Sequence, residues 1–506
     1  MKNILLSVLI LTLLVSTSPA QRVQPKPEPT KPVPTVVKPQ AAPYEIPVKV
    51  KTLANGMQVI VLSDRSVPLV TVSLAVRNGS FTEPPELNGL SHLYEHMFFK
   101  TNHATALYRC QHVQFSNQTL FNASGCDKEL ALKSQIGDVN YQGELELTGS
   151  ASNASTQQEV VEYFTSTTSP YVSTVVRSIR DAIRFPQFDE EEFAGEKQVV
   201  IGELDRNLSE PGFYLNDEMM NRLFYKYPTR KKPGGTRDTV ASATTDQMRL
   251  IQSRYYVPNN SALIVTGDVD ADAIFAMAEQ LFGDWAKSDD PFKKFPLVDH
   301  PPLAKSEGSV VIQPVQSTLI AIGWQGPSIG KDDAATYAAD VFSFILRQPG
   351  SHFSRALVDT GLVNGADLSY LTQRNVGPIQ ATMFTSADKA KPALKAFYAE
   401  VDQFDKPNYF TEEELDNAKT LLEADDLYGR EKLSEYAHTL SFWWSSTGID
   451  YFKGYYKNLR AITRADINKY VHTYIQNKPH VGLALISDEQ QAMAKLTPAD
   501  LIGGKQ

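Results

Sequence analysis

Two segments of the 506-residue chain resemble each other, and this internal similarity constrains the fold more than any other feature. In the first, Asp246 lies nine residues before Tyr255, ahead of a Pro-Asn-Asn turn and an apolar strand. In the second, Asp466 lies eight residues before Tyr474, ahead of an Asn-Lys-Pro turn and another apolar strand. The sequence therefore predicts an α+β protein of two homologous halves. Each half is expected to be a mostly antiparallel sheet with helices packed on one face, and is long enough to bury its own core.

The boundaries of the two halves follow from changes in composition. The N-terminal half is expected at residues 49–285 and the C-terminal half at residues 309–506, with a linker rich in Asp, Lys and Pro at residues 286–308. Residues 21–48 hold eight of the thirty prolines and are typical of an extended polyproline spacer. Residues 101–140 are polar and lack clear periodicity, so we expect an insert that leaves the surface of the N-terminal half.

Local patterns predict several elements after this insert. Strands are expected near residues 144–149 and 159–167, and a helix at residues 172–183. A further helix is expected to begin at Asp189, because three glutamates follow it and acids in a first turn favour the helix dipole.

The N-terminus resembles a secretory signal peptide. Lys2 precedes an apolar run at residues 4–15, and the small residues Ser18-Pro19-Ala20 follow, so cleavage is expected after Ala20. The run is too short to cross a hydrocarbon core of roughly 30 Å as a helix. We therefore predict signal peptide 1–20 and an exported protein, periplasmic or secreted, without a membrane span after cleavage. An uncut signal anchor is the alternative.

Export changes how the two cysteines are interpreted. Cys110 and Cys126 would meet an oxidising compartment, where a pair that closes a short loop favours a disulfide. Such a bond would contribute about 3 kcal/mol in the chain-entropy model. Two free buried thiols are the alternative.

Charge and composition exclude several classes of protein. The chain carries 49 Lys and Arg residues against 58 Asp and Glu residues, a formal net charge of −9, and 42% of its residues are hydrophobic. Nucleic-acid-binding proteins normally present a basic face to phosphate. These values argue against a nucleic-acid partner and against disorder throughout the chain.

The motif His92-Leu93-Tyr94-Glu95-His96 carries the most chemical information. On a helix, His92 and His96 share one face, so both imidazoles can reach one metal ion while Glu95 projects beside them. Catalytic zinc takes three protein ligands and one open position. The segment containing Glu196 and Glu203 is a candidate source of the third ligand, because these acids lie two turns apart on one helix face. Taken alone, the motif is equally compatible with a surface helix.

The surroundings of this motif resemble the pitrilysin and insulysin family of inverted-motif zinc metallopeptidases, in particular the smaller branch that includes the mitochondrial processing peptidase. The resemblance covers most of the chain, and its elements occur in the family's order. They are Asn55-Gly56, Gly79-Ser80, Glu83-Pro84, residues 89–100, Asn153-Ala154-Ser155-Thr156, residues 188–193, the Glu196 and Glu203 pair, and Tyr256-Val257-Pro258-Asn259-Asn260.

The resemblance implies a role for each of the candidate residues. One Zn²⁺ per chain would be held by His92, His96 and Glu203, with Glu95 as the general base on the metal-bound water. Glu196 would orient a ligand or the base through hydrogen bonds.

By the same resemblance, Asn153 and Ala154 would lie on an edge strand that pairs with a bound peptide. The alternative for Asn153 is a simple turn residue at the end of a strand.

Two departures from the family pattern stand out. Glu203 lies 107 residues after His96, farther than usual, and the insert accounts for the excess. His103 and His112 in the insert could contact a metal but are better interpreted as surface residues.

The second departure concerns an Arg and Tyr pair that active members direct at the substrate. Val358 and Asn364 stand at these positions here, and Tyr370 and Arg374 follow with the wrong order and spacing. Neither Val358 nor Asn364 can donate charge or a phenol to an oxyanion.

These features predict a zinc-dependent endopeptidase subunit that hydrolyses peptides or unfolded segments inside an enclosed chamber. A second two-half subunit would supply the missing Arg and Tyr pair in a heterodimer, or two copies would form a homodimer. The alternative is a non-catalytic scaffold subunit of the same fold. A zinc-storage protein is disfavoured, because the site uses three ligands and the nine histidines are scattered along the chain.

Overall fold

The computed structural model describes residues 45–112, 125–145 and 147–504, and Glu45–Gln506 forms one compact unit. The predicted signal peptide at residues 1–20 and most of the predicted spacer at residues 21–48 lie outside the described residues. Within the described part of the chain, no helix combines the length and the apolar character that crossing a membrane requires.

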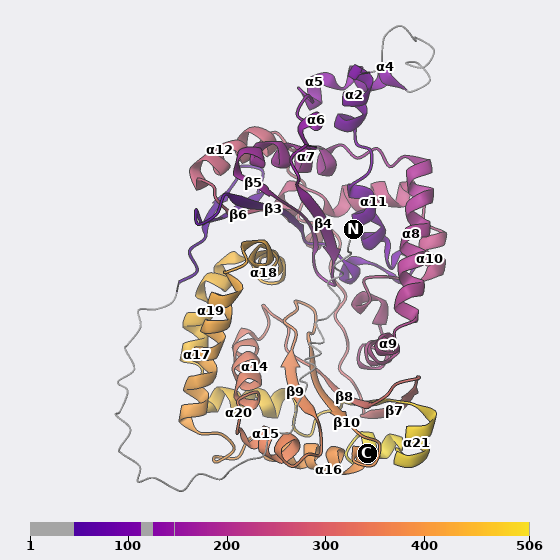
Figure 1. The fold of residues 1–506 in the computed structure, drawn as a ribbon, viewed down its shortest axis with the longest axis vertical. Helices are drawn as coiled ribbons and strands as arrows, with labels where there is room; N and C mark the ends of the chain where they lie inside the picture. Colours follow the sequence, from indigo (N-terminus) through magenta and orange to yellow (C-terminus); the bar gives the residue numbers. More distant parts are fainter. Residues whose placement is uncertain (1–44, 113–124, 146, 505–506) are drawn as a thin grey trace, which may run out of the picture. The chain divides into compact units, whose positions relative to one another are not determined.

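The described residues form a six-stranded sheet in the first half of the chain. Its strands are β1 (Lys49–Thr52), β2 (Gln58–Ser63), β3 (Leu69–Val76), β4 (Ala151–Thr156), β5 (Val161–Thr168) and β6 (Ser261–Gly267). Their order is β1-β2-β6-β3-β5-β4, and every pairing is antiparallel except the parallel pairing of β2 with β6. Strand β4 therefore lies at an edge of this sheet (Figure 1).

A five-stranded sheet in the second half repeats this arrangement. Its strands are β7 (Glu307–Ile312), β8 (Thr318–Gln325), β9 (Gly365–Tyr370), β10 (Pro378–Thr385) and β11 (Val481–Ile486). The order is β7-β11-β8-β10-β9, and only β7 and β11 are parallel. Strands β7, β11, β8, β10 and β9 thus correspond in turn to β2, β6, β3, β5 and β4. The predicted α+β fold of two homologous halves is confirmed.

The described residues of the first half and of the connection between the halves form a set of helices. They are α1 (Leu90–Phe98), α2 (His103–His112), α4 (Cys126–Ala131), α5 (Lys133–Ile136), α6 (Gln142–Leu145), α7 (Val172–Arg184), α8 (Glu190–Leu208), α9 (Pro211–Leu223), α10 (Arg237–Ala241), α11 (Thr245–Tyr255), α12 (Ala271–Phe282) and α13 (Pro291–Lys294). Short 3-10 turns are η1 (Ser80–Thr82), η2 (Pro85–Leu87), η3 (Ser169–Tyr171), η4 (Pro228–Lys231) and η5 (Pro258–Asn260).

The second half contributes its own set of helices. They are α14 (Asp333–Leu346), α15 (His352–Ser354), the π-helical turn η6 (Arg355–Asp359), α16 (Ala390–Val401), α17 (Glu412–Gly429), α18 (Leu433–Ser446), α19 (Ile449–Ala461), α20 (Arg464–Tyr474), α21 (Asp488–Ala494) and α22 (Pro498–Leu501). Helices α11 and α20, which carry the internal sequence similarity, both begin with a capping box, at Thr244 and Thr463 respectively.

One helix of each half packs against the sheet of the other half. From the first half, α9 packs on the second sheet, where Met219 and Leu223 join a buried cluster with Ala321 and Leu483. From the second half, α18 lies against β3 and β6 of the first sheet (Figure 1). The indole N–H of Trp444 on α18 donates to Gln58 Oε1 at 2.7 Å. The exchange couples the two cores, because each sheet is covered in part by a helix of the other half.

The region after residue 100 differs from the sequence prediction. Where it is described, the insert is helical: the disulfide between Cys110 and Cys126 joins α2 to α4, and a small apolar cluster around Leu107 and Ile136 lies beneath them. The periodicity was too weak to reveal these helices because most of them span fewer than two turns.

The strand predicted near residues 144–149 is wrong. This segment contains the end of α6 and a turn and bend at residues 147–148, and Gly149 has a φ of 63°, which is not extended backbone, so β4 begins only at Ala151. Glu144, expected in the strand, instead accepts a hydrogen bond from Thr174 of α7 at 2.9 Å. The strand expected at residues 159–167 and the helix expected at residues 172–183 correspond to β5 and α7.

The helix exchange predicts that the halves unfold together. Leu223 on α9 is fully buried against the second sheet, so Leu223→Ala is expected to lower the free energy of unfolding by about 2–5 kcal/mol through the cavity it creates. Urea denaturation followed by circular dichroism should give one cooperative transition, shifted as a whole. Leu208→Ala, at a 46% exposed position on α8, is the control and should change stability by about 0.5 kcal/mol or less. Two transitions, only one of them shifted, would contradict this coupling.

Candidate metal centre

Helix α1 carries the histidine motif, and a buried carboxylate fixes its N-terminus. Glu83 accepts the backbone N–H of Gly89 at 2.8 Å and that of Ser91 at 2.6 Å. Gly89 has a φ of 90°, and a Cβ there would lie 2.7 Å from the Cα of Gly235, so only glycine fits. The position of this acid beside the first turn is also favourable, because the N-terminal end of the helix dipole is positive. Together these contacts set the direction in which α1 leaves the loop.

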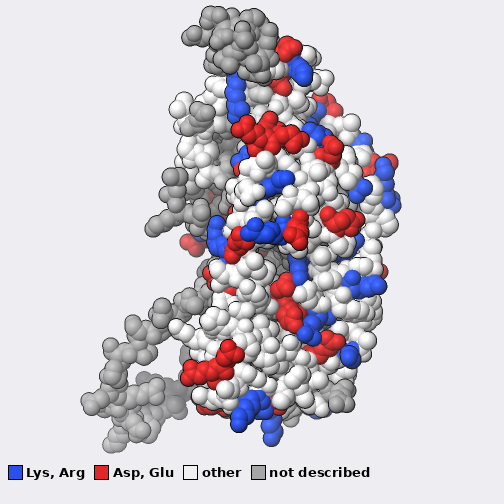
Figure 2. Space-filling view, turned by 90° about the vertical axis from the view of Figure 1, so that its right-hand side faces the viewer, with Lys and Arg blue, Asp and Glu red and all other residues white. Residues whose placement is uncertain are grey.

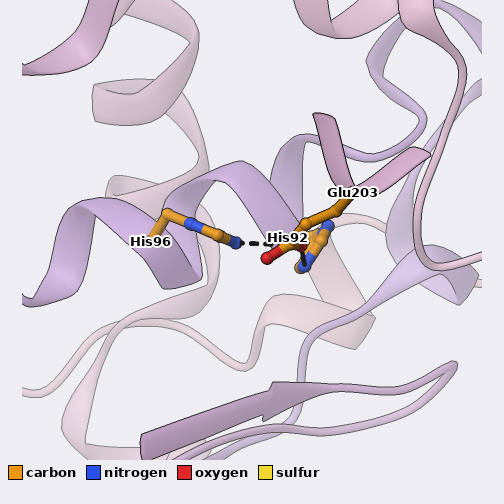
Figure 3. A group of neighbouring side chains, drawn as sticks. All are labelled: His92, His96 and Glu203. Carbon is orange, nitrogen blue, oxygen red and sulfur yellow. Dashed lines mark ion pairs between the residues drawn. The ribbon is translucent and has the colours of Figure 1, made fainter. Parts of the chain in front are cut away.

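His92 and His96 project from the same side of α1 toward Glu203, which comes from α8 (Figure 3). The Nε2 atom of His92 lies 3.6 Å from Oε2 of Glu203, and Nε2 of His96 lies 3.6 Å from the same oxygen. The donor atoms of all three residues lie within 4.8 Å of one another. The structure therefore brings together two histidines and a glutamate that the sequence separates by 107 residues.

The electrostatics of two of the three side chains, His92 and Glu203, favour cation binding. Burial, and then the neighbouring His96, lower the pKa of His92 to about 4. The hydrogen bond from His96 keeps the pKa of Glu203 below its ordinary value. Burial by itself would lower the pKa of His96, but the hydrogen bond and charge of Glu203 outweigh it and raise that pKa. A neutral His92 and an ionised Glu203 are the forms that bind metal.

The donor set and its spacing fit zinc. Two imidazole nitrogens and one carboxylate oxygen are a donor set found at catalytic zinc, with one position left open. Metal–ligand bonds of about 2.0–2.1 Å at tetrahedral angles place neighbouring donors about 3.4 Å apart. The two nitrogen-to-oxygen distances of 3.6 Å lie close to this value.

Glu196, one of the two acids considered for the third ligand, lies behind His96. Its Oε2 is 3.2 Å from Nδ1 of His96, and its Oε1 is 2.5 Å from Nζ of Lys100. A carboxylate on the far nitrogen of a histidine fixes the ring orientation and leaves Nε2 free to bind metal. The lysine in turn fixes the carboxylate, so His96 is held from behind by an ion pair.

Glu95 is a buried carboxylate on α1 between the two histidines. Its residue is 8% exposed, and burial raises its pKa to about 7. Oε2 accepts a hydrogen bond from the hydroxyl of Thr156, the last residue of β4, at 2.5 Å. A carboxylate with a pKa near neutrality can accept and return a proton at physiological pH. No role for Thr156 follows from the sequence, although Thr156 lies on the same strand face as Ala154, two residues away.

Asn153 and Ala154 lie on β4, at the edge of the first sheet. They pair with Phe164 and Tyr163 of β5. The backbone N–H of Ala154 donates to the side-chain oxygen of the exposed Asn153 at 2.9 Å. In the order of the described strands, β4 has one neighbour, so its other side is available to an added strand.

The residues discussed for the Arg and Tyr positions lie in the second half. Val358 is part of the π-helical turn η6, and the backbone of Asn364 donates to Phe384 at 2.7 Å. The Tyr370 hydroxyl donates to the Pro327 carbonyl at 3.0 Å, and Nε of Arg374 donates to the Ser446 carbonyl at 2.9 Å. The structure therefore gives Tyr370 and Arg374 partners within the second half.

Of the two insert histidines, the structure describes the side chain of His103, and this side chain is not in the donor group. Nδ1 of His103 lies 2.8 Å from Oε2 of Glu129, so this ring joins α2 to α4. The side chain of His112 lies outside the described part of the structure. The insert is nevertheless attached next to the site, because Glu192 of α8 accepts both the backbone N–H and the hydroxyl of Thr101.

One face of the molecule shows no large area of a single charge. Helices α8 and α10 lie on the right of Figure 1, and the view of that side in Figure 2 shows acidic and basic residues interspersed. An ion pair between Arg237 of α10 and Asp205 of α8 joins the two helices. A mixed surface of this kind gives no electrostatic preference for a polyanion on this face.

The fold and this site define a class: two homologous α+β halves, with a His-x-x-Glu-His helix and a distant glutamate in the first. Comparison with known proteins gives the family. Residues 58–124 and 128–234 match the model described as "Insulinase (Peptidase family M16)", and residues 242–422 match "Peptidase M16 inactive domain". The chain belongs to the M16 peptidase family, and the resemblance seen in its sequence is confirmed.

Relatives cover most of the chain at low identity. The "Zinc protease PqqE" of Helicobacter pylori is 23% identical over 434 residues, which cover 84% of this chain and 90% of the relative. A protease structure from Helicobacter pylori matches with a TM-score of 0.71 at 20% identity, over 87% of this chain and 99% of that one. The periplasmic protease PqqL from Escherichia coli matches with a TM-score of 0.66 at 16% identity, over 92% of this chain and 51% of PqqL.

Measured zinc affinity should distinguish the metal ligands, such as His96, from Glu196, which only orients a ligand. His96→Ala is expected to abolish high-affinity zinc binding, because it removes one of three donors. Glu196→Gln is expected to retain zinc with an affinity lowered about 10–100-fold, because the ring orientation of His96 is lost. Metal analysis and competition with a chromogenic chelator measure both effects.

The matched control is Glu191→Gln, an exposed glutamate in the first turn of the same helix α8, which should bind zinc like the unmodified protein. Unchanged zinc affinity in His96→Ala would refute the ligand set. Unchanged affinity in Glu196→Gln would refute the orienting role of Glu196.

Proposed function

We propose that this chain is a zinc-dependent endopeptidase subunit that cleaves peptides or unfolded polypeptide segments. The observation that carries the proposal is the convergence of His92, His96 and Glu203 beside the buried carboxylate of Glu95. Membership of a peptidase family and a relative named as a zinc protease support it. One zinc ion per chain would be held by the three donors.

Different residues of this chain would have different roles in hydrolysis. Zinc, when bound, polarises a peptide carbonyl and lowers the pKa of a nearby water towards about 7. Glu95 takes a proton from the water that attacks the carbonyl carbon and passes it to the amine that leaves. The open edge of β4, with Asn153 and Ala154, would hold the substrate as an added strand through main-chain hydrogen bonds.

A second two-half unit is part of the proposal. Val358 and Asn364 leave this chain without the Arg and Tyr pair, so a partner subunit would supply it, or a second copy would complete a homodimer. The match to about half of PqqL supports such an arrangement, since that protein has room for two units of this size. Two units would enclose a chamber that admits peptides and unfolded segments and excludes folded proteins.

The proposed chain organisation follows the sequence. It consists of a signal peptide at residues 1–20, a spacer at residues 21–48, a catalytic half at residues 49–285, a linker at residues 286–308 and a C-terminal half at residues 309–506. An exported, periplasmic or secreted protein agrees with a structural relative described as periplasmic and with the Cys110–Cys126 disulfide.

Replacement of the proposed base gives the direct test. Glu95→Gln is expected to lower kcat for a quenched fluorescent peptide by at least about 100-fold, because an amide cannot accept the proton from water. Zinc content should stay the same, because Glu95 is not one of the three donors. Glu86→Gln, an exposed glutamate in the turn η2, is the control and should retain full activity. Full activity in Glu95→Gln would rule out the proposed chemistry.

The assembly distinguishes the enzyme from a scaffold of the same fold. Native mass spectrometry of protein purified from its own source is expected to show a two-chain particle that contains zinc and cleaves peptide. A partner that supplies an Arg and Tyr pair should raise kcat when it is added to the isolated chain. A particle that is metal-free and inert with every partner present would favour the scaffold, the alternative that the absent Arg and Tyr pair supports.

A further inference from the structure

We propose that Thr156 is a positioning residue for Glu95, and that the second half of the chain sets the position of Thr156 through the loop at residues 373–376. The inference rests on the proposed peptidase function and deepens it. In this inference the second half of the chain, which carries none of the metal ligands, contributes to catalysis. It fixes the end of β4, where Thr156 holds the base Glu95.

The first observation is the hydrogen bond between β4 and the base. The hydroxyl of Thr156 donates to Oε2 of Glu95 at 2.5 Å, and among the described residues no other side chain donates to this carboxylate. Glu95 is buried, so its carboxylate has little water to orient it. With Oε2 occupied, Oε1 is the oxygen left for the proton of the attacking water. A base must lie within about 2.6–3.2 Å of the proton's parent atom, so its orientation matters directly.

The second observation is that the chain after Thr156 is tightly held. Thr156 pairs with Val161 at the end of the β4–β5 hairpin, and the turn between them closes with the N–H of Gln157 on the Val160 carbonyl at 2.8 Å. A Cβ at Gly79, whose φ is 137°, would lie 2.3 Å from the Gln157 carbonyl oxygen. The turn thus lies directly against the backbone of the loop that leads to α1.

The third observation is a pair of buried charges that hold the loop at residues 373–376, between β9 and β10 of the second half. Glu159, three residues after Thr156 and 5% exposed, accepts the backbone N–H of Arg374 at 2.8 Å and that of Asn375 at 3.1 Å. Lys231, also 5% exposed, donates to the Asn375 carbonyl at 2.6 Å and the Val376 carbonyl at 2.8 Å.

The geometry of this loop makes the attachment specific. The carboxylate of Glu159 accepts hydrogen bonds from two consecutive N–H groups, and the ammonium of Lys231 donates to two consecutive carbonyls. Both buried side chains therefore bind the backbone of this loop at defined positions. Lys231 also donates to the side chain of Gln373. Val376 has a φ of 53°, an unfavourable conformation for a β-branched residue that its surroundings must enforce. The second half therefore contacts the β4–β5 turn through two hydrogen bonds to Glu159 that fix its position against this loop.

The consequence for catalysis is a chain of short contacts. Lys231 and Glu159 hold the loop, Glu159 is in the turn that ends β4, and Thr156 at the end of β4 holds Glu95. A displacement of the turn would shift the hydroxyl and with it the carboxylate. A misplacement of about 1 Å at a reacting group can cost about 100-fold in rate.

Isosteric replacement of Thr156 tests the positioning role. Thr156→Val removes the hydroxyl and keeps the shape, and is expected to lower kcat for a quenched peptide about 10–100-fold. KM should change less than about 2-fold and zinc content should stay the same, because the substitution leaves the β4 backbone unchanged and the side chain touches neither substrate nor metal in this proposal. Thr156→Ser keeps the hydroxyl and should restore kcat to within about 3-fold of the original value.

The control is Thr165→Val on β5. Its hydroxyl lies 2.8 Å from the Ser152 hydroxyl on β4, so this variant also removes a hydroxyl contact between the same two strands, but one that does not involve Glu95. It should leave kcat unchanged. Thermal unfolding of each variant shows that loss of rate does not come from loss of fold.

A double-mutant cycle tests the link to the second half. Glu159→Gln leaves an amide oxygen that can accept only part of the loop's N–H groups, and kcat should fall in the same direction as with Thr156→Val. Because both changes act through the position of the Glu95 carboxylate, kcat of the double variant should be little lower than kcat of Thr156→Val alone.

Each outcome bears on a different claim. Normal kcat in Thr156→Val, in an enzyme that Glu95→Gln inactivates, overturns the positioning role and leaves the proposed function intact. Strictly multiplicative losses in the double variant overturn the link to the second half. A wild-type protein without cleavage in any assembly overturns the proposed function and this inference together.

Discussion

The site depends on how the N-terminus of α1 is fixed. A buried carboxylate, Glu83, binds the first amides of the helix, and Gly89 allows its backbone to approach Gly235 closely. These contacts fix the rotation of α1 about its axis. That rotation decides whether His92 and His96 face α8 and Glu203 or face the core. A metal centre built from two segments far apart in sequence needs such a constraint, because a helix that could turn would scatter its donors.

The second half is structurally necessary although it contributes no residue to the donor group. Its helix α18 covers one face of the first sheet, where Glu162 of β5 accepts hydrogen bonds from Ser73 and Ser441 and pairs with His438. In the same way, α9 of the first half packs on the second sheet. The second unit, which contributes none of the three donor residues, thus forms part of the packing of the first unit.

The sequence predicted the features that depend on local pattern. Two halves followed from a repeated helix-turn-strand segment, and the histidine pair followed from helical spacing. It could not predict the exchange of α9 and α18 or the hydrogen bond from Thr156 to Glu95, because these contacts join residues from 61 to several hundred positions apart. Periodicity reports which face of an element is buried and not against which partner. The insert helices were missed for a different reason, since most are too short to show a period.

The insert shows why the donors tolerate a long interruption between them. It carries a small core of its own, including Leu107 and Ile136, and a disulfide, so it does not draw on the core of the first half. Both ends are fixed to elements that belong to the site's framework: Thr101 is bound by Glu192 on α8, and the Ile136 carbonyl accepts from Arg180 on α7 at 3.1 Å. An insertion whose ends stay in place costs mainly loop entropy, which grows slowly with length. The distance between α1 and α8 is therefore set by their packing and is independent of how many residues the chain places between them.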